Sequence, residues 1–340
     1  MEGSSATSLP AHETRAPRAL SLMHRTADRV LPRLRLTRYH QGPDPRFRAA
    51  VERLLEGARG DPRQLFRTAG LLALPLAPSA AATAFHLPSP VTMPGDEANN
   101  VLYGHWFPAA TRPPLAATVF LHGWRRDALR YEFLFCQGLA AQGIDCLLLV
   151  LPYHGPRRPA GTWSGELALS PDIYRTVWGF RQAVIEARLA AHWLRAYRTQ
   201  RVGIVGFSLG GMIAHVVMAT EAFDFGVSIG AAGALAELVF TSPATRGVRA
   251  AMVRHGIDRA TLRQTWQCID PLTFGPLNRT RRLLMMSGKY DAIVPEPFTR
   301  LLWESYGRPP WRRFPCGHWT ASFYSQQAVA ETCAFVRTGR

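Results

Sequence analysis

From about residue 84 onward, apolar runs of strand length alternate with longer stretches of helical pattern. The runs expected to be strands are Val101–Phe107, Thr118–Leu121, Cys146–Leu151, Val202–Val205, Phe225–Ile229, Arg282–Met286 and Trp311–Pro315. The stretches expected to be helices are Tyr131–Gln142, Ile173–Arg198, Gly211–Ala222 and Ser322–Arg337. This alternation predicts an α/β fold with a doubly wound, mostly parallel sheet of about eight strands. Ligands of such sheets bind beyond the carboxyl ends of the strands, so chemistry is expected in the residues after each strand.

Residues 1–83 precede this alternation, and we expect them to form an Arg-rich, partly helical N-terminal extension of a main domain at 84–340. Two Asp-Pro pairs in the extension, at 44–45 and 61–62, predict helix starts, because Asp caps a helix and Pro is tolerated in its first turn. In the mixed apolar and basic stretch Ala19–Tyr39, Pro32 is expected to interrupt the helical pattern. We expect this stretch to pack on the main domain or to remain solvated; contact with an anionic membrane surface is the alternative.

The stretch 231–281 lies between two expected strands and is longer than a plain crossover needs. We expect it to form a small helical cap over the site, with Phe240, Met252 and Trp266 as apolar lining. The alternative is a crossover whose helices lie away from the site.

Charge and cysteine content limit the partners and the compartment. The formal net charge is +16, but 39 of the 40 basic residues are arginines spread along the whole chain, so we expect no specific nucleic-acid partner. The five cysteines are widely spaced, with no Cys-x-x-Cys pair, and the sequence has no dinucleotide-binding glycine pattern. We therefore expect reduced thiols, no metal, no cofactor and a cytoplasmic protein, membrane-associated if the N-terminal stretch binds lipid.

One serine stands in the turn between an expected strand and an expected helix. Val202–Val205 is followed by GFSLGG (206–211) and then by an apolar helical stretch. Such a turn holds the serine in strained backbone geometry above the sheet, and the flanking glycines allow close packing of helix on strand. The helix N-terminus favours negative charge that develops beside the hydroxyl. Ser208 is therefore the candidate nucleophile.

A serine hydroxyl needs a base, and the base needs a carboxylate that orients it. Asp291 follows the expected strand Arg282–Met286, and His318 follows the last expected strand. Because parallel strands end at one edge of a sheet, both side chains are expected on the same rim as Ser208. The order along the chain predicts Asp291 as the acid and His318 as the base.

Two backbone N–H groups are expected to bind the oxyanion of a tetrahedral intermediate. One is the N–H of Leu209, directly after the candidate nucleophile. The other is the N–H of Trp124, because Gly123 lets the loop after Thr118–Leu121 turn inward. His122 is expected to hold this loop by hydrogen bonds rather than to take part in catalysis.

These motifs resemble those of the α/β-hydrolase superfamily over roughly residues 85–340. The resemblance rests on FLHGW (120–124), GFSLGG (206–211), GKYDAIVP (288–295) and GHW (317–319). It implies the serine-nucleophile branch, with Ser208, Asp291 and His318 as the catalytic triad. The stretch LPYHGPR (151–157) is similar to a dienelactone-hydrolase-like branch and to relatives of the α/β-hydrolase domain-containing 18 group. Typical members lack the long N-terminal extension.

Two arginine pairs are expected to border the mouth of the pocket. Arg125-Arg126 follow the oxyanion loop, and Arg157-Arg158 come shortly after Tyr153-His154. We predict a small-molecule or lipid-like acyl substrate, and because guanidinium groups bind carboxylates and phosphates, one hypothesis is that this substrate is anionic. The candidate substrate-binding residues are Tyr153, His154, Arg125, Arg157 and Arg158. The alternative is that arginines fall there by chance in an arginine-rich chain.

The predicted triad indicates acyl transfer through an acyl-serine intermediate. With water as the acceptor, the protein is an esterase or lipase, which is the function we expect. Another alcohol as the acceptor gives an acyltransferase, and an amide substrate gives a peptidase. A non-catalytic protein that binds a ligand or a membrane surface is the remaining alternative, and an intact triad argues against it.

Overall fold

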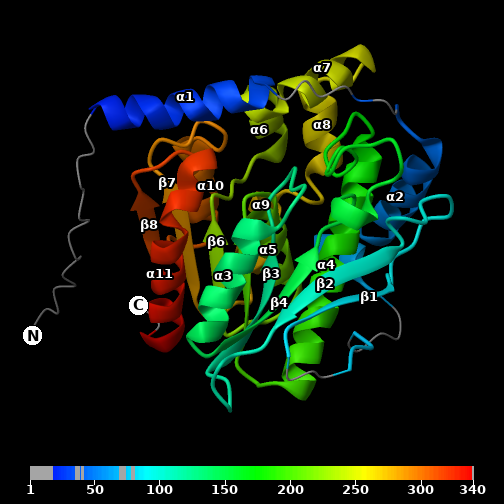
Figure 1. Cartoon of the computed structure of the whole chain (residues 1–340). Helices are drawn as coiled ribbons and strands as arrows, with labels where there is room; N and C mark the ends of the chain where they lie inside the picture. Colours follow the sequence, from blue (N-terminus) through cyan, green and yellow to red (C-terminus); the bar gives the residue numbers. More distant parts are fainter. Residues whose placement is uncertain (1–17, 35–38, 40–41, 69–73, 78–80, 339–340) are drawn as a thin grey trace, which may run out of the picture.

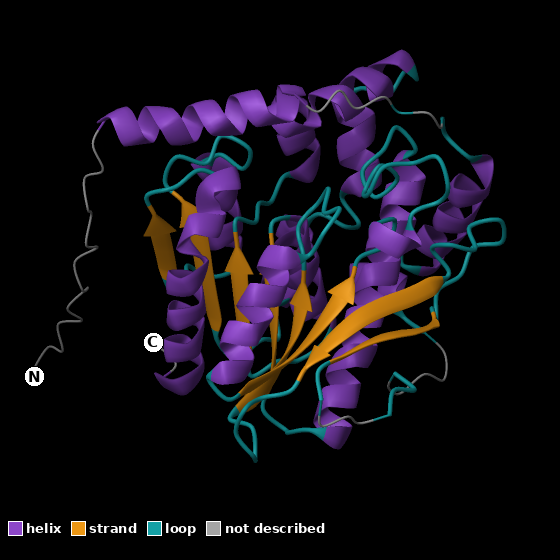
Figure 2. Cartoon of the chain, in the orientation of Figure 1, coloured by secondary structure: helices purple, strands orange, loops and turns teal. Residues whose placement is uncertain are grey.

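The computed structural model describes residues 18–34, 39, 42–68, 74–77 and 81–338. These residues form an eight-stranded sheet with helices on both faces (Figure 1, Figure 2). The strands are β1 (Thr83–Pro88), β2 (Val101–Phe107), β3 (Ala116–Leu121), β4 (Ile144–Val150), β5 (Val202–Phe207), β6 (Phe225–Ile229), β7 (Leu283–Gly288) and β8 (Trp311–Phe314). The order across the sheet is β1-β2-β4-β3-β5-β6-β7-β8. Pairs β1–β2 and β2–β4 are antiparallel and the other pairs are parallel, which confirms the predicted fold.

Helices connect and cover the strands. The α-helices are α1 (Arg18–Leu34), α2 (Pro45–Gly57), α3 (Arg130–Ala141), α4 (Ile173–Tyr197), α5 (Leu209–Thr220), α6 (Leu235–Thr241), α7 (Arg246–Arg254), α8 (Arg259–Trp266), α9 (Pro271–Phe274), α10 (Glu296–Ser305) and α11 (Ser325–Thr338). The 3-10 segments are η1 (Pro62–Phe66), η2 (Gly155–Arg157), η3 (Pro243–Thr245), η4 (Gly275–Leu277) and η5 (Trp319–Tyr324).

Two apolar cores lie on opposite faces of the sheet. Phe120, Leu148 and Val205 stand in register on β3, β4 and β5, and they belong to the core under α3 and α11. The residue before each of them on its strand belongs to the larger core under α4 and α5. The central strands are therefore buried on both faces, as their continuous apolar runs predict.

Every predicted strand is present, within two residues of its expected bounds. β1 and α10 had no predicted counterpart. β1 is an edge strand whose side chains are mostly exposed, so it lacks the continuous apolar run that marks the central strands. It is held by its antiparallel pairing with β2.

The described part of the N-terminal extension packs on the main domain, one of the two outcomes expected for it. Asp44 and Asp61 cap their helices as predicted, since their carboxylates accept from the N–H groups of Arg46 and Arg63. The expected break at Pro32 was wrong: α1 runs through it to Leu34. Pro32 lies in the last turn, so only two residues of α1 follow the proline. Residues 1–17 lie outside the described residues, so membrane contact through them stays a prediction.

α1 crosses the carboxyl edge of the sheet above β7 and β8 (Figure 1). It contacts η3 on one side and η5, which begins one residue after His318, on the other. None of the helices in the described ranges is both long and apolar enough to span a membrane.

Candidate functional site

Ser208 lies at the tip of a sharp turn between β5 and α5. Its backbone has φ 53° and ψ −117°, a conformation that costs free energy for a residue with a Cβ. The turn is held by a hydrogen bond of 2.7 Å from the Ser208 N–H to the carbonyl of Ile229 on β6. A Cβ on Gly206 or Gly210 would collide with backbone atoms of the turn or of the neighbouring strand end, so both positions require glycine.

The structure brings Ser208, His318 and Asp291 together from the ends of β5, β8 and β7. The Ser208 Oγ and the His318 Nε2 are 2.9 Å apart, and the His318 Nδ1 and the Asp291 Oδ2 are 2.7 Å apart. The other oxygen of Asp291 accepts from the N–H groups of Ile293 and Val294, at 2.9 and 2.7 Å, which fixes the carboxylate. These bonds form one chain from hydroxyl to imidazole to carboxylate, the arrangement that activates a serine.

The charges around His318 favour its protonated form. Burial lowers the pKa of His318, but the charge and hydrogen bond of Asp291 and the charge of Asp28 raise it, and the pKa lies above its ordinary value of 6.5. Arg126 acts in the opposite direction. An imidazolium formed when His318 takes a proton is thus stabilised by the carboxylates beside it.

The loop after β3 passes close to the nucleophile. A Cβ on Gly123 would lie 3.4 Å from the Cβ of Ser208, so this loop runs beside the serine. The side chain of Trp124 is anchored by a hydrogen bond of 2.7 Å from its indole N–H to the carbonyl of Gly165. Leu209 is the first residue of α5, where N–H groups have no partner within the helix. The roles of Leu209 and Trp124 as oxyanion donors stay a prediction.

A sequence model described as "Alpha/beta hydrolase family" matches residues 118–334, a range that contains Ser208, Asp291 and His318. The chain belongs to the α/β-hydrolase family. The narrower resemblance of residues 151–157 to a dienelactone-hydrolase-like branch stays a prediction.

The chain is also similar to a curated protein and to solved structures. The "Uncharacterized protein Rv2627c" of Mycobacterium tuberculosis (strain ATCC 25618 / H37Rv) is 31% identical over 188 residues, which cover 54% of this chain but only 44% of that protein. The acylaminoacyl peptidase of Pyrococcus horikoshii has a TM-score of 0.55 at 14% identity, over 76% of this chain and 41% of that chain. The hyperthermophilic esterase from Pyrobaculum calidifontis has a TM-score of 0.54 at 15% identity, over 93% and 97%. At such low sequence identities, these similarities show only that this chain has the same fold as the two proteins.

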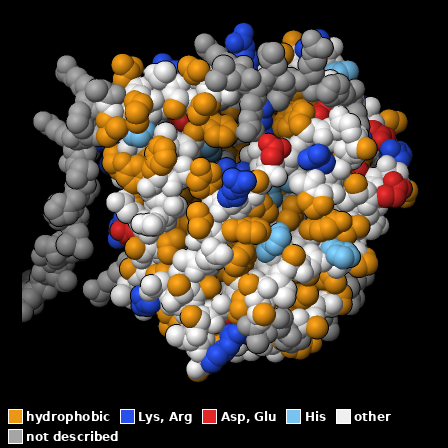
Figure 3. All heavy atoms as spheres, in the orientation of Figure 1, with side chains coloured by type: hydrophobic (Ala, Val, Ile, Leu, Met, Phe, Trp, Pro, Cys, Tyr) orange, Lys and Arg blue, Asp and Glu red, His pale blue; other side chains and the backbone are white. Residues whose placement is uncertain are grey.

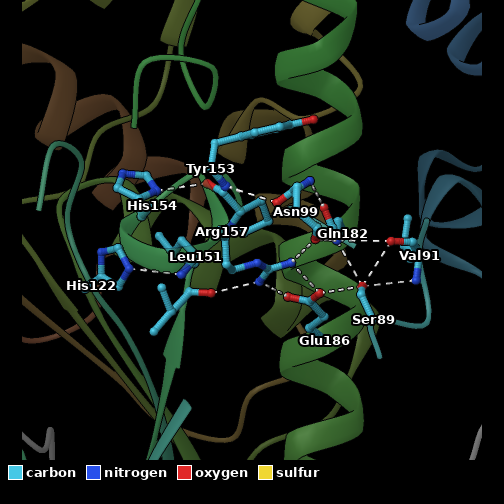
Figure 4. Close-up of polar contacts among 12 residues, drawn as sticks. Ser89, Val91, Asn99, His122, Leu151, Tyr153, His154, Arg157, Gln182 and Glu186 are labelled. Atoms are coloured by element: carbon cyan, nitrogen blue, oxygen red, sulfur yellow. Dashed lines mark hydrogen bonds and ion pairs between the residues drawn. The ribbon is translucent and has the colours of Figure 1, made fainter. Parts of the chain in front are cut away.

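Two buried histidines, His122 and His154, hold the loop after β3 against the end of β4 (Figure 4). His122 bonds to the carbonyl of Gly123 through Nδ1, and its Nε2 accepts from the N–H of Leu151 at 2.9 Å. His154 bonds to Pro152 through Nδ1, and its Nε2 accepts from the N–H of Arg125 at 3.3 Å. An accepting Nε2 requires a neutral ring. Burial lowers the pKa of His122 well below its usual value and that of His154 to about 4, so both rings stay neutral.

Arg157 does not border a pocket mouth, so this expectation was wrong, and Tyr153, a candidate substrate-binding residue, lies in the interior as well. Both side chains are fully buried. The Arg157 guanidinium forms a two-pronged ion pair with Glu186 on α4, at 2.7 and 2.8 Å, and donates to the carbonyls of Val150 and Asn99 (Figure 4). The Tyr153 hydroxyl donates to Asp96 at 2.8 Å. The two terminal nitrogens of the guanidinium make these four bonds, which offset much of the free energy lost when the charge is buried, whereas its Nε has no hydrogen-bond partner among the described residues.

The other arginines near the loop differ in their surroundings. Arg126 is paired with Glu132 at 2.7 Å. The Arg125 guanidinium lies over the rings of Trp124 and Trp163, 5.3 and 4.8 Å from their centroids, and is buried. Arg158 is exposed. Of the four arginines in the two sequence pairs, all except Arg158 interact with other side chains of the protein, which weakens the argument for an anionic substrate.

A cavity of about 340 Å³ lies beside the oxyanion loop. His122, His154 and Arg126 line it, together with apolar side chains of β1, β2, β4 and α3 and of the residue before α3, namely Phe85, Tyr103, Val150, Phe133 and Leu129. Apolar and histidine side chains occupy the surface between α3 and β2 (Figure 3). Within the described residues, no group of three or more His, Cys, Asp or Glu side chains is arranged to hold a metal ion.

Helices α6 and α7 of the stretch 231–281 rise beyond the carboxyl ends of the strands (Figure 1). Of the three residues expected to line the site, Met252 and Trp266 are buried in the large apolar core. The Trp266 indole donates to the carbonyl of Ile173 at the start of α4. Phe240 is half-buried, with the Arg259 guanidinium over its ring. A cap that covers the substrate stays a prediction.

Proposed function

We propose that this hydrolase cleaves a carboxylic ester through an acyl-serine intermediate on Ser208. The observation that carries the proposal is the continuous hydrogen-bonded chain from Ser208 through His318 to Asp291. The strained turn at Ser208 and the nearby loop with Gly123 support it, because they present the hydroxyl where an oxyanion would meet backbone N–H groups.

The reaction follows from this geometry. The Ser208 Oγ attacks the ester carbonyl carbon while its proton passes to the Nε2 of His318, and the N–H groups of Leu209 and Trp124 stabilise the oxyanion. The bond to the leaving oxygen breaks, and His318 gives that oxygen the proton. Water then loses a proton to His318 and attacks the acyl-serine, and the Ser208 Oγ leaves with the proton. Asp291 holds the Nδ1 proton and stabilises the imidazolium in both halves.

The walls of the cavity beside the oxyanion loop favour an apolar acyl group. Leu129, Phe133 and Val150 present hydrocarbon, and the Arg126 guanidinium on the cavity wall is paired with Glu132. The wall also carries the carboxylate of Asp127 and three imidazoles, those of His105, His122 and His154. Burial of alkyl groups against such side chains is favourable by about 0.8 kcal/mol per methylene. We propose that the acyl chain of the substrate lies in this cavity, because His122 and Arg126 on its wall belong to the loop that carries Trp124.

Activity should rise with pH through the pKa of His318, because only the neutral imidazole can accept the Ser208 proton. The pKa of His318 is raised above 6.5, so the acidic limb of kcat/KM against pH is expected to have its midpoint above 6.5. The measurement is kcat/KM for a neutral ester over a pH series at constant ionic strength. A midpoint well below 6.5 would contradict this electrostatic description of the site.

A fluorophosphonate probe tests the proposed function directly, because it reacts with an activated serine and needs no knowledge of the substrate. The full chain is expected to be labelled at Ser208, located by mass spectrometry of its peptides. The labelled protein is then compared with the unlabelled protein on p-nitrophenyl esters of short and long acyl chains and on the matching anilides. We expect ester hydrolysis that labelling abolishes. Absence of labelling, or faster cleavage of the anilides, would refute an esterase.

A further inference from the structure

The carboxylate of Asp28, on α1, is bonded to both loops that carry the base and the acid of the triad. One oxygen accepts from the N–H of Ala292 at 3.0 Å and from the N–H of His318 at 2.8 Å, and the other accepts from the N–H of Trp319 at 3.0 Å. Asp28 is fully buried, and α1 crosses the ends of β7 and β8 that lead into these loops (Figure 1). One side chain thus connects residues adjacent to Asp291 with the backbone of His318 itself.

Three further contacts fit α1 to the same loops. His24, one turn before Asp28, stacks on Tyr290 with ring centroids 6.1 Å apart, and the Arg25 guanidinium lies over the same ring at 5.9 Å. Gly317 leaves room for the carboxylate, since a Cβ there would lie 2.7 to 2.9 Å from the carboxylate atoms of Asp28. Gly317 does not have a positive φ, so space and not backbone conformation is what glycine provides at this position.

We propose that Asp28 is a positioning residue, which makes α1 part of the active-site framework by fixing the loops of Asp291 and His318 relative to each other. This inference rests on the proposed function. Both loops follow edge-side strands of the sheet, and the short β8 pairs with one neighbour, so a tie across their ends restricts the distance between acid and base. Small displacements of such groups reduce rates strongly.

The Asp28 charge also acts on His318. His318 faces the carboxylates of Asp291 and Asp28 and the guanidinium of Arg126, and both carboxylates raise its pKa. Asp28 in turn faces Asp291 and the thiol of Cys316, with His24 beside it on α1. Removal of the Asp28 charge should therefore lower the pKa of His318, whereas a purely structural carboxylate far from the site would leave it unchanged.

The test is the rate constant for fluorophosphonate labelling of Ser208, measured against pH on the full chain. Asp28→Asn keeps the size of the side chain but loses the charge and at least one of the three accepted bonds. We expect labelling at the pH optimum to be about tenfold slower than in wild type. We also expect the midpoint of the acidic limb of the pH profile to shift by about half a pH unit toward lower pH. Gly317→Ala, which displaces the carboxylate without changing any charge, is expected to slow labelling to a similar extent.

The matched control is Asp270→Asn. The Asp270 carboxylate also accepts from three backbone N–H groups, those of Ala234, Leu235 and Leu272, but it bonds to neither triad loop. For Asp270→Asn we expect the acidic limb of the labelling pH profile to coincide with that of wild type. Two results would overturn the inference while the proposed function stands. One is that wild type and Asp28→Asn have the same labelling rate constant and the same midpoint of the acidic limb. The other is that Asp28→Asn and Asp270→Asn are slowed equally and neither shows a shifted midpoint. If wild type is not labelled at Ser208, the proposed function fails and the inference fails with it.

Discussion

Ser208→Ala is expected to lower kcat for the best ester substrate by about 10⁴-fold or more, with little change in KM. The substitution removes the atom that forms the covalent intermediate and leaves the substrate-binding groups in place. Ala is accommodated beside His318 without added volume, and the hydroxyl accounts for one hydrogen bond, to His318. The measurement is initial-rate kinetics on the ester that wild type hydrolyses fastest, with fluorophosphonate labelling in parallel.

The control for this variant is Ser305→Ala, at the end of α10, whose hydroxyl donates to the carbonyl of Leu272. It is expected to retain wild-type kcat, KM and labelling. Residual activity of Ser208→Ala within tenfold of wild type would show that ester cleavage occurs by another route, for example direct attack by water. Such a result would refute the acyl-serine intermediate.

The sequence predicts the arrangement of the triad because local patterns encode it. The apolar run of β5 and the glycines around Ser208 determine a strand, a tight turn and a helix within about ten residues. Asp291 and His318 each follow a strand, and parallel strands carry their carboxyl ends to one edge. Strand pairing therefore brings distant residues together without any pattern that links them directly.

Asp28 could not be predicted in this way. It lies in a stretch that reads as an amphipathic segment interrupted by Pro32, and its partner His318 is 290 residues further along the chain. A carboxylate that accepts hydrogen bonds from backbone N–H groups needs no complementary side chain. The partner loops therefore contain no opposite charge that would indicate the contact from the sequence. The glycine at 317 is the one local signal, and it equally well suits an ordinary turn.

The misplacement of Arg157 has a similar physical cause. Arginine in a loop after a strand is usually solvated, so the sequence favours an exposed position. The opposite outcome depends on Glu186, which lies among apolar residues in the middle of α4 and faces the sheet. The ion pair forms because α4 packs against the sheet, and no local sequence pattern predicts the contact between Arg157 and Glu186.

Breaking this buried pair is expected to lower the free energy of unfolding by about 3–5 kcal/mol. Arg157→Met leaves the Glu186 carboxylate buried, with the N–H groups of Arg157 gone and the hydroxyl of Ser89 as a remaining donor (Figure 4). The matched control is Arg312→Met, which breaks the exposed pair of Arg312 and Glu331, and it should cost at most about 1 kcal/mol. Urea unfolding followed by tryptophan fluorescence measures both.

The double variant Arg157→Met/Glu186→Leu separates the cost of an unpaired charge from the contribution of the pair. If the single variant is destabilised because a carboxylate is left buried without its cation, removal of that carboxylate should restore about half of the lost free energy or more. If the guanidinium instead acts mainly through its bonds to the carbonyls of Val150 and Asn99, the double variant should be no more stable than Arg157→Met. Strong recovery would mean that Arg157→Met is destabilised mainly by the unpaired Glu186 carboxylate, and that the ion pair itself adds little to the stability of the loop from Val150 to Arg157.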